Sequence, residues 1–264
     1  MAANTFPESL ELNYFNTTTQ AVLGSNTALS SYLFNRDLTF QYITSGFNND
    51  ATTASIVISF DQTTTIDRIA LLGHNLKGYT VFYNGATANV FALTSTSATT
   101  TANFSSNSEP SQYFRVTPVA CTSVTLDLKT TQTTNAEKAI GYLYLGALNL
   151  SFERIPSSKN YHPVLDQTQI IHKLSDGGTR VQNIAEKIKI DFKYQNITST
   201  FRDNLKDLYR RSDAFFFCPF GTTTSFDELF FECVWEGPFD FMAYSDDAVS
   251  SGFGGTIRLR ETAL

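Results

Sequence analysis

Three histidines are the side chains best suited to metal or acid–base chemistry, and their spacing argues against both. His74 stands alone, while His162 and His172 lie ten residues apart. None has a second histidine one helical turn away, or a nearby cysteine or carboxylate set that would complete a metal site. We therefore predict that each is a turn or surface histidine.

Two acidic pairs, at residues 227–228 and 246–247, could serve sugar hydrolysis or calcium binding. Hydrolysis requires two carboxyl groups held across a cleft, and neither pair has the spacing of a calcium loop. The glycine-rich segment 251–255 precedes a strand, so it offers phosphate no helix N-terminus. Nucleophile-elbow and P-loop motifs are absent from the sequence. We predict no catalytic, cofactor-binding or metal-binding residues and a protein that is not an enzyme.

The composition excludes several classes of binding partner. A net charge of −6 and a pI near 5.1 argue against sequence-specific binding of nucleic acid and against anionic membranes. No apolar run approaches the roughly 20 residues that span a bilayer, and the N-terminus lacks the basic and apolar regions of a secretory signal. Cys121, Cys218 and Cys233 have no metal-ligand spacing, so we expect buried thiols in a protein assembled in a reducing cytoplasm.

The elements that would position any site are mostly strands. Ile56, Ile58 and Phe60 alternate with small polar residues, which is the period of a half-buried strand. Similar runs occupy 66–72, 79–83, 113–116 and 124–128, and Asn84 with Gly85 predicts a two-residue hairpin turn. Residues 140–146 are apolar on both faces and suit a central strand. Long connectors rich in Thr and Ser favour a β-sandwich.

A change to polar, strand-poor sequence near 152–163 predicts a domain boundary. We assign residues 1–152 to a first domain, in which 1–20 form an N-terminal arm, and 153–264 to a second. The second domain has a turn at 176–178 and an alternating strand at 186–194, which has one polar, wet face and one apolar, dry face.

The second domain also has an amphipathic helix at about 200–211, in which Thr200 is the predicted N-cap and Asp203 completes a capping box. An aromatic strand follows at Phe215, of which we expect two of three phenylalanines to be core. The fold class is mainly β: a jelly-roll β-sandwich followed by a second β-sandwich or split barrel with one packed α-helix.

The strand runs at 54–60, 66–76, 113–116 and 140–146 resemble the discoidin, or coagulation-factor-5/8 C-type, jelly roll, in versions found in phage virion proteins. The resemblance covers roughly residues 21–150. It implies a galactose-binding-like sandwich, which in the wider family binds sugars, lipids or proteins through loops at one end.

The order of strand, helix and aromatic strand in the second half resembles phage tail-tube and distal-tail folds. That layout implies a subunit of a ring, expected to be a hexamer, between the tail tube and the host-facing tip. The expected function is thus a structural component of a phage tail tip or baseplate, located in the virion and partnered by itself and other tail proteins.

Two sets of surface residues follow from these hypotheses. Assembly is expected to use the alternating strand and the loop at 239–255, through Lys187, Lys189, Asp191, Lys193, Phe239 and Phe241. The alternative function is a carbohydrate-binding module for host surface glycans, with Tyr79, Tyr83 or Tyr113 as aromatic contacts. A glycan-degrading enzyme is a third hypothesis, and no acid and base pair supports it.

Overall fold

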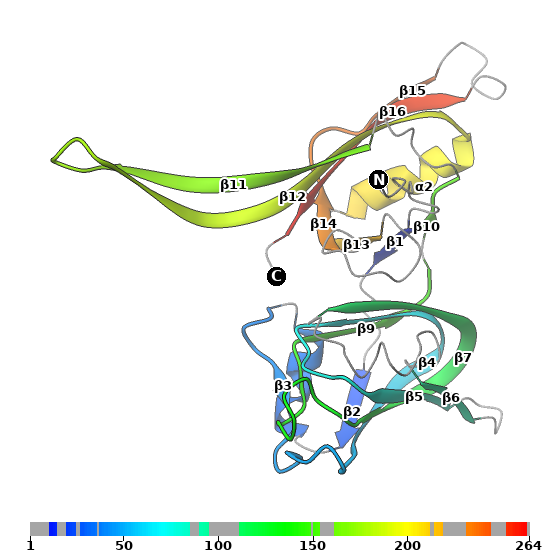
Figure 1. Ribbon diagram of the computed structural model, residues 1–264. Helices are drawn as coiled ribbons and strands as arrows, with labels where there is room; N and C mark the ends of the chain where they lie inside the picture. Colours follow the sequence, from blue (N-terminus) through cyan, green and yellow to red (C-terminus); the bar gives the residue numbers. More distant parts are fainter. Residues whose placement is uncertain are drawn as a thin grey trace, which may run out of the picture. The chain divides into compact units, whose positions relative to one another are not determined.

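The chain forms two compact units, each described here by itself. The computed structural model describes residues 11–14, 20–24, 27–35, 37–84, 90–94, 111–148, 150–153, 161–211, 214–218, 231–243 and 252–262. The jelly-roll unit spans Phe15–Leu148, and the helix-bearing unit consists of Met1–Tyr14 and Asn149–Ala263. The described parts are mainly β-strand, which confirms the predicted fold class (Figure 1). None of their helices is long and apolar enough to cross a membrane.

The jelly-roll unit is built on one large antiparallel sheet in the order β2-β4-β7-β5-β6, with β9 paired to β4 and a small β3-β8 sheet. Its elements are β2 (Gln20–Gly24), η1 (Thr27–Phe34), β3 (Tyr42–Ile43), β4 (Ala54–Leu72), β5 (Tyr79–Asn84), β6 (Val90–Thr94), β7 (Gln112–Leu128), β8 (Ala139–Ile140) and β9 (Tyr142–Gly146).

Two long strands bend across this unit. The predicted strands at 55–60 and 66–72 are one strand, β4, and those at 113–116 and 124–128 are one strand, β7. The β4–β7 register shifts twice, and such irregularities let a long strand coil. The first half of β4 therefore pairs with β2 while its second half pairs with β9. Alternate aliphatic side chains of β4 and β7 fill the core.

Two local predictions for this unit differ from the structure. The β5–β6 hairpin forms, but its register pairs Asn84 with Val90, so five residues connect the strands instead of two. The apolar run at 140–146 is divided by Gly141, where an added Cβ would lie 2.9 Å from a methyl carbon of Leu38. The strand β9 is buried along its whole length, as predicted for a covered central strand.

The helix-bearing unit has one sheet in the order β10-β1-β13-β14-β16-β12-β11, with β15 also paired to β16. Its elements are β1 (Glu11–Tyr14), β10 (Leu150–Ser151), β11 (Tyr161–Lys173), β12 (Thr179–Ile197), α2 (Ser199–Arg211), β13 (Phe215–Cys218), β14 (Phe231–Trp235), β15 (Asp240–Ala243) and β16 (Phe253–Glu261). Because β1 pairs with β10 and β13, the N-terminal arm contributes a strand to this unit and not to the jelly roll.

Helix α2 begins one residue before the predicted start, and its N-cap lies two residues before the predicted one. The hydroxyl of Thr198 accepts a 3.1 Å hydrogen bond from the Phe201 amide, so Thr198 and not Thr200 is the N-cap. Glu153 accepts hydrogen bonds from both the amide and the hydroxyl of Thr198. Sequence reasoning placed the cap by the Thr-x-x-Asp spacing and had no means of finding Glu153.

The core of the helix-bearing unit is aromatic. The helix buries Phe201, Leu205 and Leu208 as the predicted apolar stripe. Phe192 stacks on Phe217 at 6.0 Å between ring centroids. All three phenylalanines of β13 are buried, where two were expected.

Candidate assembly surface

The most prominent feature of the helix-bearing unit is a long hairpin formed by β11 and β12, which projects from its sheet (Figure 1). The antiparallel register runs from Tyr161 opposite Phe192 to Lys173 opposite Thr179. Strand β16 pairs with β12 only from Lys189 onward. Between Lys189 and the turn, the hairpin is therefore two-stranded within the described residues. Roughly ten residues per strand at about 3.3 Å each give a projection of about 30 Å. We call this two-stranded part, residues 165–188 with its turn, the ribbon.

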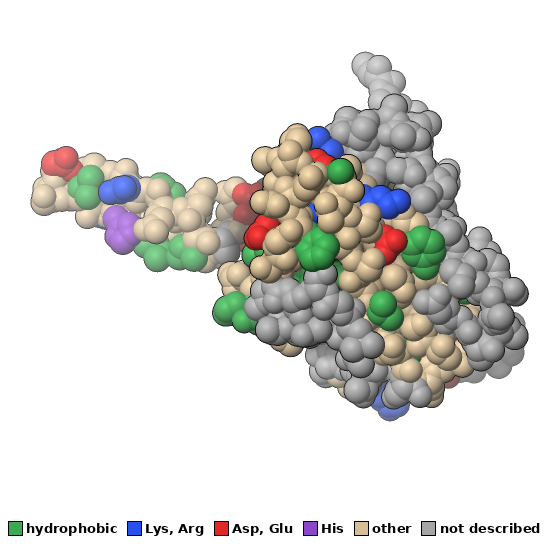
Figure 2. Space-filling model, turned by 90° about the horizontal axis from the view of Figure 1, so that it is seen from below, with side chains coloured by type: hydrophobic (Ala, Val, Ile, Leu, Met, Phe, Trp, Pro, Cys, Tyr) green, Lys and Arg blue, Asp and Glu red, His purple; other side chains and the backbone are tan. Residues whose placement is uncertain are grey.

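The ribbon exposes aliphatic side chains along both strands, and Figure 2 shows hydrophobic groups on its surface. Ile171 and Val181 lie directly opposite each other and are 61 % and 52 % exposed. The other large exposed aliphatic residues of the hairpin and its turn are Val164, Leu165, Ile170, Leu174 and Ile184. An isolated two-stranded ribbon is at best marginally stable in water, and exposed apolar strands are aggregation hazards. Such a surface is typical of an element that a partner covers.

A bulge fixes which residues share a face of the ribbon. Thr168 is opposite Ala185, but Gln169 is opposite Asn183, so Ile184 is an extra residue in β12. The residues of β11 on the face of Leu165 are then Gln167, Gln169 and Ile171. One face therefore carries a polar pair, Gln169 with Asn183, next to the apolar pair of Ile171 with Val181.

The four predicted contact residues of β12 lie on its polar face. Asp191 and Lys193 are exposed, and Lys187 and Lys189 are half-buried, while Ile190, Phe192 and Tyr194 on the other face are buried. One wet and one dry face were predicted, and burial confirms both. Their contact with another chain stays a prediction.

The base of the hairpin is held by an ion-pair network on that polar face. The Lys189 ammonium lies 2.9 Å from the Asp166 carboxylate, and Arg260 reaches both Asp166, at 3.9 Å, and Glu236, at 3.4 Å. The hydrogen bond from Lys189 and the two cations lower the pKa of Asp166. These groups are partly exposed to solvent, so the network orients β11 on β12 more than it stabilises the fold.

The two predicted aromatic contacts pack mainly inside their own unit. Phe241 is buried, and Phe239 is half-buried against it at 5.0 Å between ring centroids. Phe241 therefore has little surface to offer a neighbouring chain. Residues 244–251 of the same predicted contact loop lie outside the described residues.

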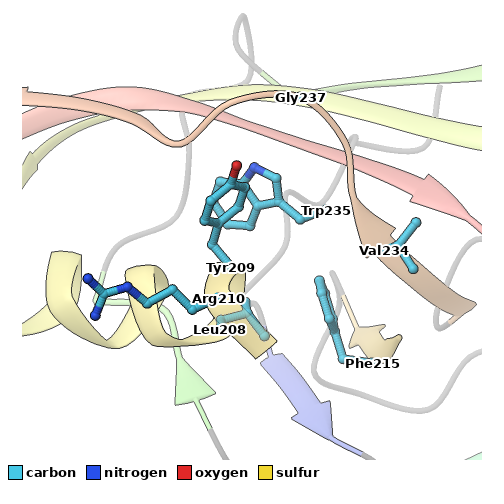
Figure 3. Close-up of a pocket in the computed structure, with 7 residues that line it drawn as sticks. All are labelled: Leu208, Tyr209, Arg210, Phe215, Val234, Trp235 and Gly237. Atoms are coloured by element: carbon cyan, nitrogen blue, oxygen red, sulfur yellow. The ribbon is translucent and has the colours of Figure 1, made fainter. Parts of the chain in front are cut away.

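A cavity of about 440 Å³ lies between the C-terminal end of α2 and strand β14 (Figure 3). It is lined by Leu208, Tyr209, Arg210, Phe215, Val234, Trp235 and Gly237. More of its lining surface is polar than apolar, and Arg210 is the charged residue among the lining ones. The indole Nε1 of Trp235 is buried and has no hydrogen-bond acceptor among the described groups. Nothing in the sequence pattern pointed to this cavity, because its walls come from three separate elements.

The glycan contacts predicted on β5 need correction. Tyr79 and Tyr83 are each only 2 % exposed, because β5 is an interior strand whose odd-numbered side chains face the core. Neither ring offers a face for a sugar. Tyr113 is half-buried. The large exposed aromatic residue of the described part of this unit is Phe40, which is 48 % exposed and lies 5.5 Å from the Tyr32 ring.

The histidines and acidic residues that were considered for metal binding or catalysis do not form a common site within the described parts of the chain. His74 lies in the loop after β4, but it is buried and not at the surface. His172 is exposed on the ribbon, and the side chain of His162 lies outside the described ones, as do both acidic pairs. Within the described parts of the chain, no three His, Cys, Asp or Glu side chains could hold a metal ion.

The remaining candidates are structural. All three cysteines are buried thiols, as predicted, and none of them forms a disulfide with another described residue. In the glycine-rich segment, a Cβ on Gly255 would lie 2.0 Å from the Asp240 carbonyl oxygen. This glycine therefore allows β15 to pack closely on β16, and phosphate binding is not needed to explain it.

Comparison with known proteins gave structural matches only. No protein-family model matches the chain. No curated protein matches it either. Among solved structures, chitosan-binding module 1 of a chitosanase/glucanase from Paenibacillus sp. IK-5 is 12 % identical, with a TM-score of 0.39 over 51 % of this chain and 98 % of the module.

A family 32 carbohydrate-binding module from Clostridium perfringens, in complex with GalNAc-β-1,3-galactose, is 10 % identical, with a TM-score of 0.38 over 49 % of this chain and 95 % of that one. A pectin-binding module is 14 % identical, with a TM-score of 0.36 over 51 % and 93 %. These solved structures are carbohydrate-binding modules, and each matches about half of the chain.

Proposed function

We propose that this chain is a non-catalytic structural subunit that assembles with copies of itself through the ribbon, as a ring component of a phage tail tip or baseplate. The observation that carries the proposal is the ribbon, whose aliphatic side chains have no core of their own. Burying Ile171 and Val181 against a neighbour would remove their apolar surface from water. This would stabilise the assembly by about 25 cal/mol for each Å² of apolar surface buried. The phage tail is proposed from the resemblance of the strand, helix and strand order alone.

The test is the mass of the full chain in solution as a function of concentration, by sedimentation and light scattering, with electron-microscope class averages of any large species. The double variant Ile171→Ser with Val181→Ser should shift assembly to higher concentration. The matched control is Gln169→Ser with Asn183→Ser, which changes the neighbouring polar pair on the same face and should have no effect. A wild-type chain that stays monomeric at every concentration would overturn self-assembly.

The second candidate is glycan binding by the jelly-roll unit, which is the class of protein to which the similar solved structures belong. The observation that favours it in this chain is the exposed ring of Phe40 beside Tyr32, because aromatic faces suit the C–H surfaces of sugars. The test is titration calorimetry with chitosan oligosaccharides and GalNAc-β-1,3-galactose. Binding that is lost in Phe40→Ala and kept in Ser31→Ala would support it, and no binding of either sugar would count against it.

A further inference from the structure

The two faces of the ribbon differ in charge. We call the face that carries the Leu165 side chain the Leu165 face. From the base of the ribbon to its tip, the cross-strand pairs on this face are Leu165 with Ile188, Gln167 with Glu186, Gln169 with Asn183, and Ile171 with Val181. Glu186 is the charged residue among them, whereas the opposite face carries Asp166, Lys187 and Arg180. The Leu165 face is therefore the less charged of the two.

The order of the pairs on the Leu165 face is the same from either end. An apolar pair lies at the base, two polar pairs lie at the centre, and an apolar pair lies near the tip. Leu165 and Ile171 are six residues apart on β11, which is about 20 Å in a strand. When a second ribbon is laid on this face in the opposite direction, apolar pairs meet apolar pairs and polar pairs meet polar pairs. The face is thus complementary to itself in an antiparallel arrangement.

The polar centre of this face can be covered with little loss of hydrogen bonding. The side-chain amide of Gln167 donates a 2.6 Å hydrogen bond to the Glu186 carboxylate, and that of Gln169 donates one of 3.1 Å to the Gln167 carbonyl oxygen. These groups have partners within their own ribbon, so a covering surface leaves fewer of them unsatisfied. The apolar ends differ, because Leu165 is 54 % and Ile171 61 % exposed. Burial of the ends would stabilise the contact, and the centre would set its register.

The charge of the ribbon also favours a second ribbon as its partner. The whole chain has a formal charge of −6, so two copies repel each other on average. The ribbon itself is neutral with His172 counted as uncharged, because its basic and acidic residues balance: Lys173, Arg180 and Lys187 against Asp166, Asp176 and Glu186. Two ribbons can therefore approach each other without net repulsion.

We propose that the ribbons of two copies of this chain stack face to face and antiparallel, each through its Leu165 face. Ile171 and Val181 of one copy cover Leu165 of the other, and symmetry repeats this contact at the other end. This inference rests on the proposed self-assembly and names the surface on which the ribbon docks. Both copies use the same surface, so the contact joins chains in pairs, and a ring requires a second contact in addition.

The direct test is disulfide formation between two purified full-length variants after mixing. One carries Leu165→Cys and the other Ile171→Cys, which the antiparallel stack places opposite each other. Two copies of the same variant keep these thiols about 20 Å apart. The matched control replaces Ile171→Cys with Ile170→Cys, at an exposed neighbour whose side chain points to the opposite face. The native cysteines are buried and should add little background.

We expect several-fold more disulfide-linked heterodimer from Leu165→Cys with Ile171→Cys than from the control mixture, with the linked peptides identified by mass spectrometry. A second readout leaves the Leu165 face unchanged. Spin labels on Ser175→Cys, in the tip turn, should lie about 45 Å apart, because each tip is about seven residues from the centre of the contact. Ribbons that pair in the same direction would instead bring the two labels within about 20 Å.

The outcomes separate this inference from the proposed function. Suppose that Ile171→Ser with Val181→Ser weakens assembly, but the heterodimer does not exceed the control or the tip labels lie close together. Assembly through the ribbon then holds, and the antiparallel stack is overturned. If the wild-type chain stays monomeric at every concentration and no crosslink forms, both are overturned.

Discussion

The ammonium group of Lys138 donates a 2.8 Å hydrogen bond to the backbone carbonyl of Phe47 and a second, at 3.3 Å, to that of Asn49. Lys138 is completely buried in the jelly-roll unit. Burial lowers its pKa, and the nearby carboxylate of Asp50 partly offsets this. The lysine thus holds the loop before β4 from inside through hydrogen bonds to two of its backbone carbonyl groups.

We expect Lys138→Met to destabilise the jelly-roll unit by about 1 to 3 kcal/mol, because two backbone carbonyl groups lose their charged donor. Hydrogen exchange of the peptides around residues 44–50 would report the loss. Trp235 is the only tryptophan and lies in the other unit, so its fluorescence transition should stay unchanged. Lys129→Met, at an exposed position, is the control. Equal exchange in the two variants would contradict the role of Lys138.

The burial of His74 predicts acid sensitivity. Its Nδ1 accepts a hydrogen bond from the Leu76 amide at 3.0 Å, and burial lowers the pKa of His74 from 6.5 to about 4. Between pH 6.5 and about 4, His74 is therefore protonated in the unfolded chain and neutral in the folded one. Stability from the neutral imidazole is complete above pH 6.5 and falls by roughly 3 kcal/mol as the pH drops to 4.

Denaturant titrations from pH 7 to 4, followed by hydrogen exchange in the jelly-roll unit, would measure this slope. His74→Asn keeps an acceptor for the Leu76 amide and cannot titrate in this range. Its free energy of unfolding should fall less with acidification than that of the wild type. Parallel pH profiles of the two chains would show that His74 is not the source of the acid sensitivity.

The cap of α2 can be assigned by a pair of substitutions. Thr198→Ala should lower the stability of the helix-bearing unit by about 1 kcal/mol, because the Phe201 amide loses its acceptor. Thr200→Ala should change little, since Thr200 is exposed within the first turn. Denaturant unfolding followed by Trp235 fluorescence measures both, and a larger loss for Thr200→Ala would restore the cap predicted from the sequence.

Gly255 should tolerate no side chain. An added Cβ would lie 2.0 Å from the Asp240 carbonyl oxygen and 2.7 Å from the Phe241 ring, so Gly255→Ala must push β15 off β16. We expect a shift in Trp235 fluorescence, since Phe241 packs against Trp235 at 6.5 Å between ring centroids. Gly177→Ala has open space and only backbone strain, about 1 kcal/mol, to overcome, and it should leave the fluorescence unchanged. The close packing of β15 would be refuted by two identical spectra.

Most strands that sequence analysis found have a dry face, such as that of β4, where Ile56, Ile58 and Phe60 are buried and alternate with more exposed residues. Strand β11 was missed because its aliphatic residues occur as neighbours, Val164 with Leu165 and Ile170 with Ile171, on opposite faces. A period of two identifies a strand that packs on its own core, and the ribbon has none. The cavity was unpredictable for a different reason, since only the fold brings β14 beside α2.

The pairing of Glu11 with Cys218 has a consequence for the order of synthesis. The whole jelly-roll unit is inserted between the first and second strands of the other sheet. On the ribosome, the pairing of β1 with β13 must wait until β13 has emerged, by which time the jelly roll can already be folded. A folded jelly roll removes the flexibility of residues 15–148, which shortens the effective loop that this late pairing has to close.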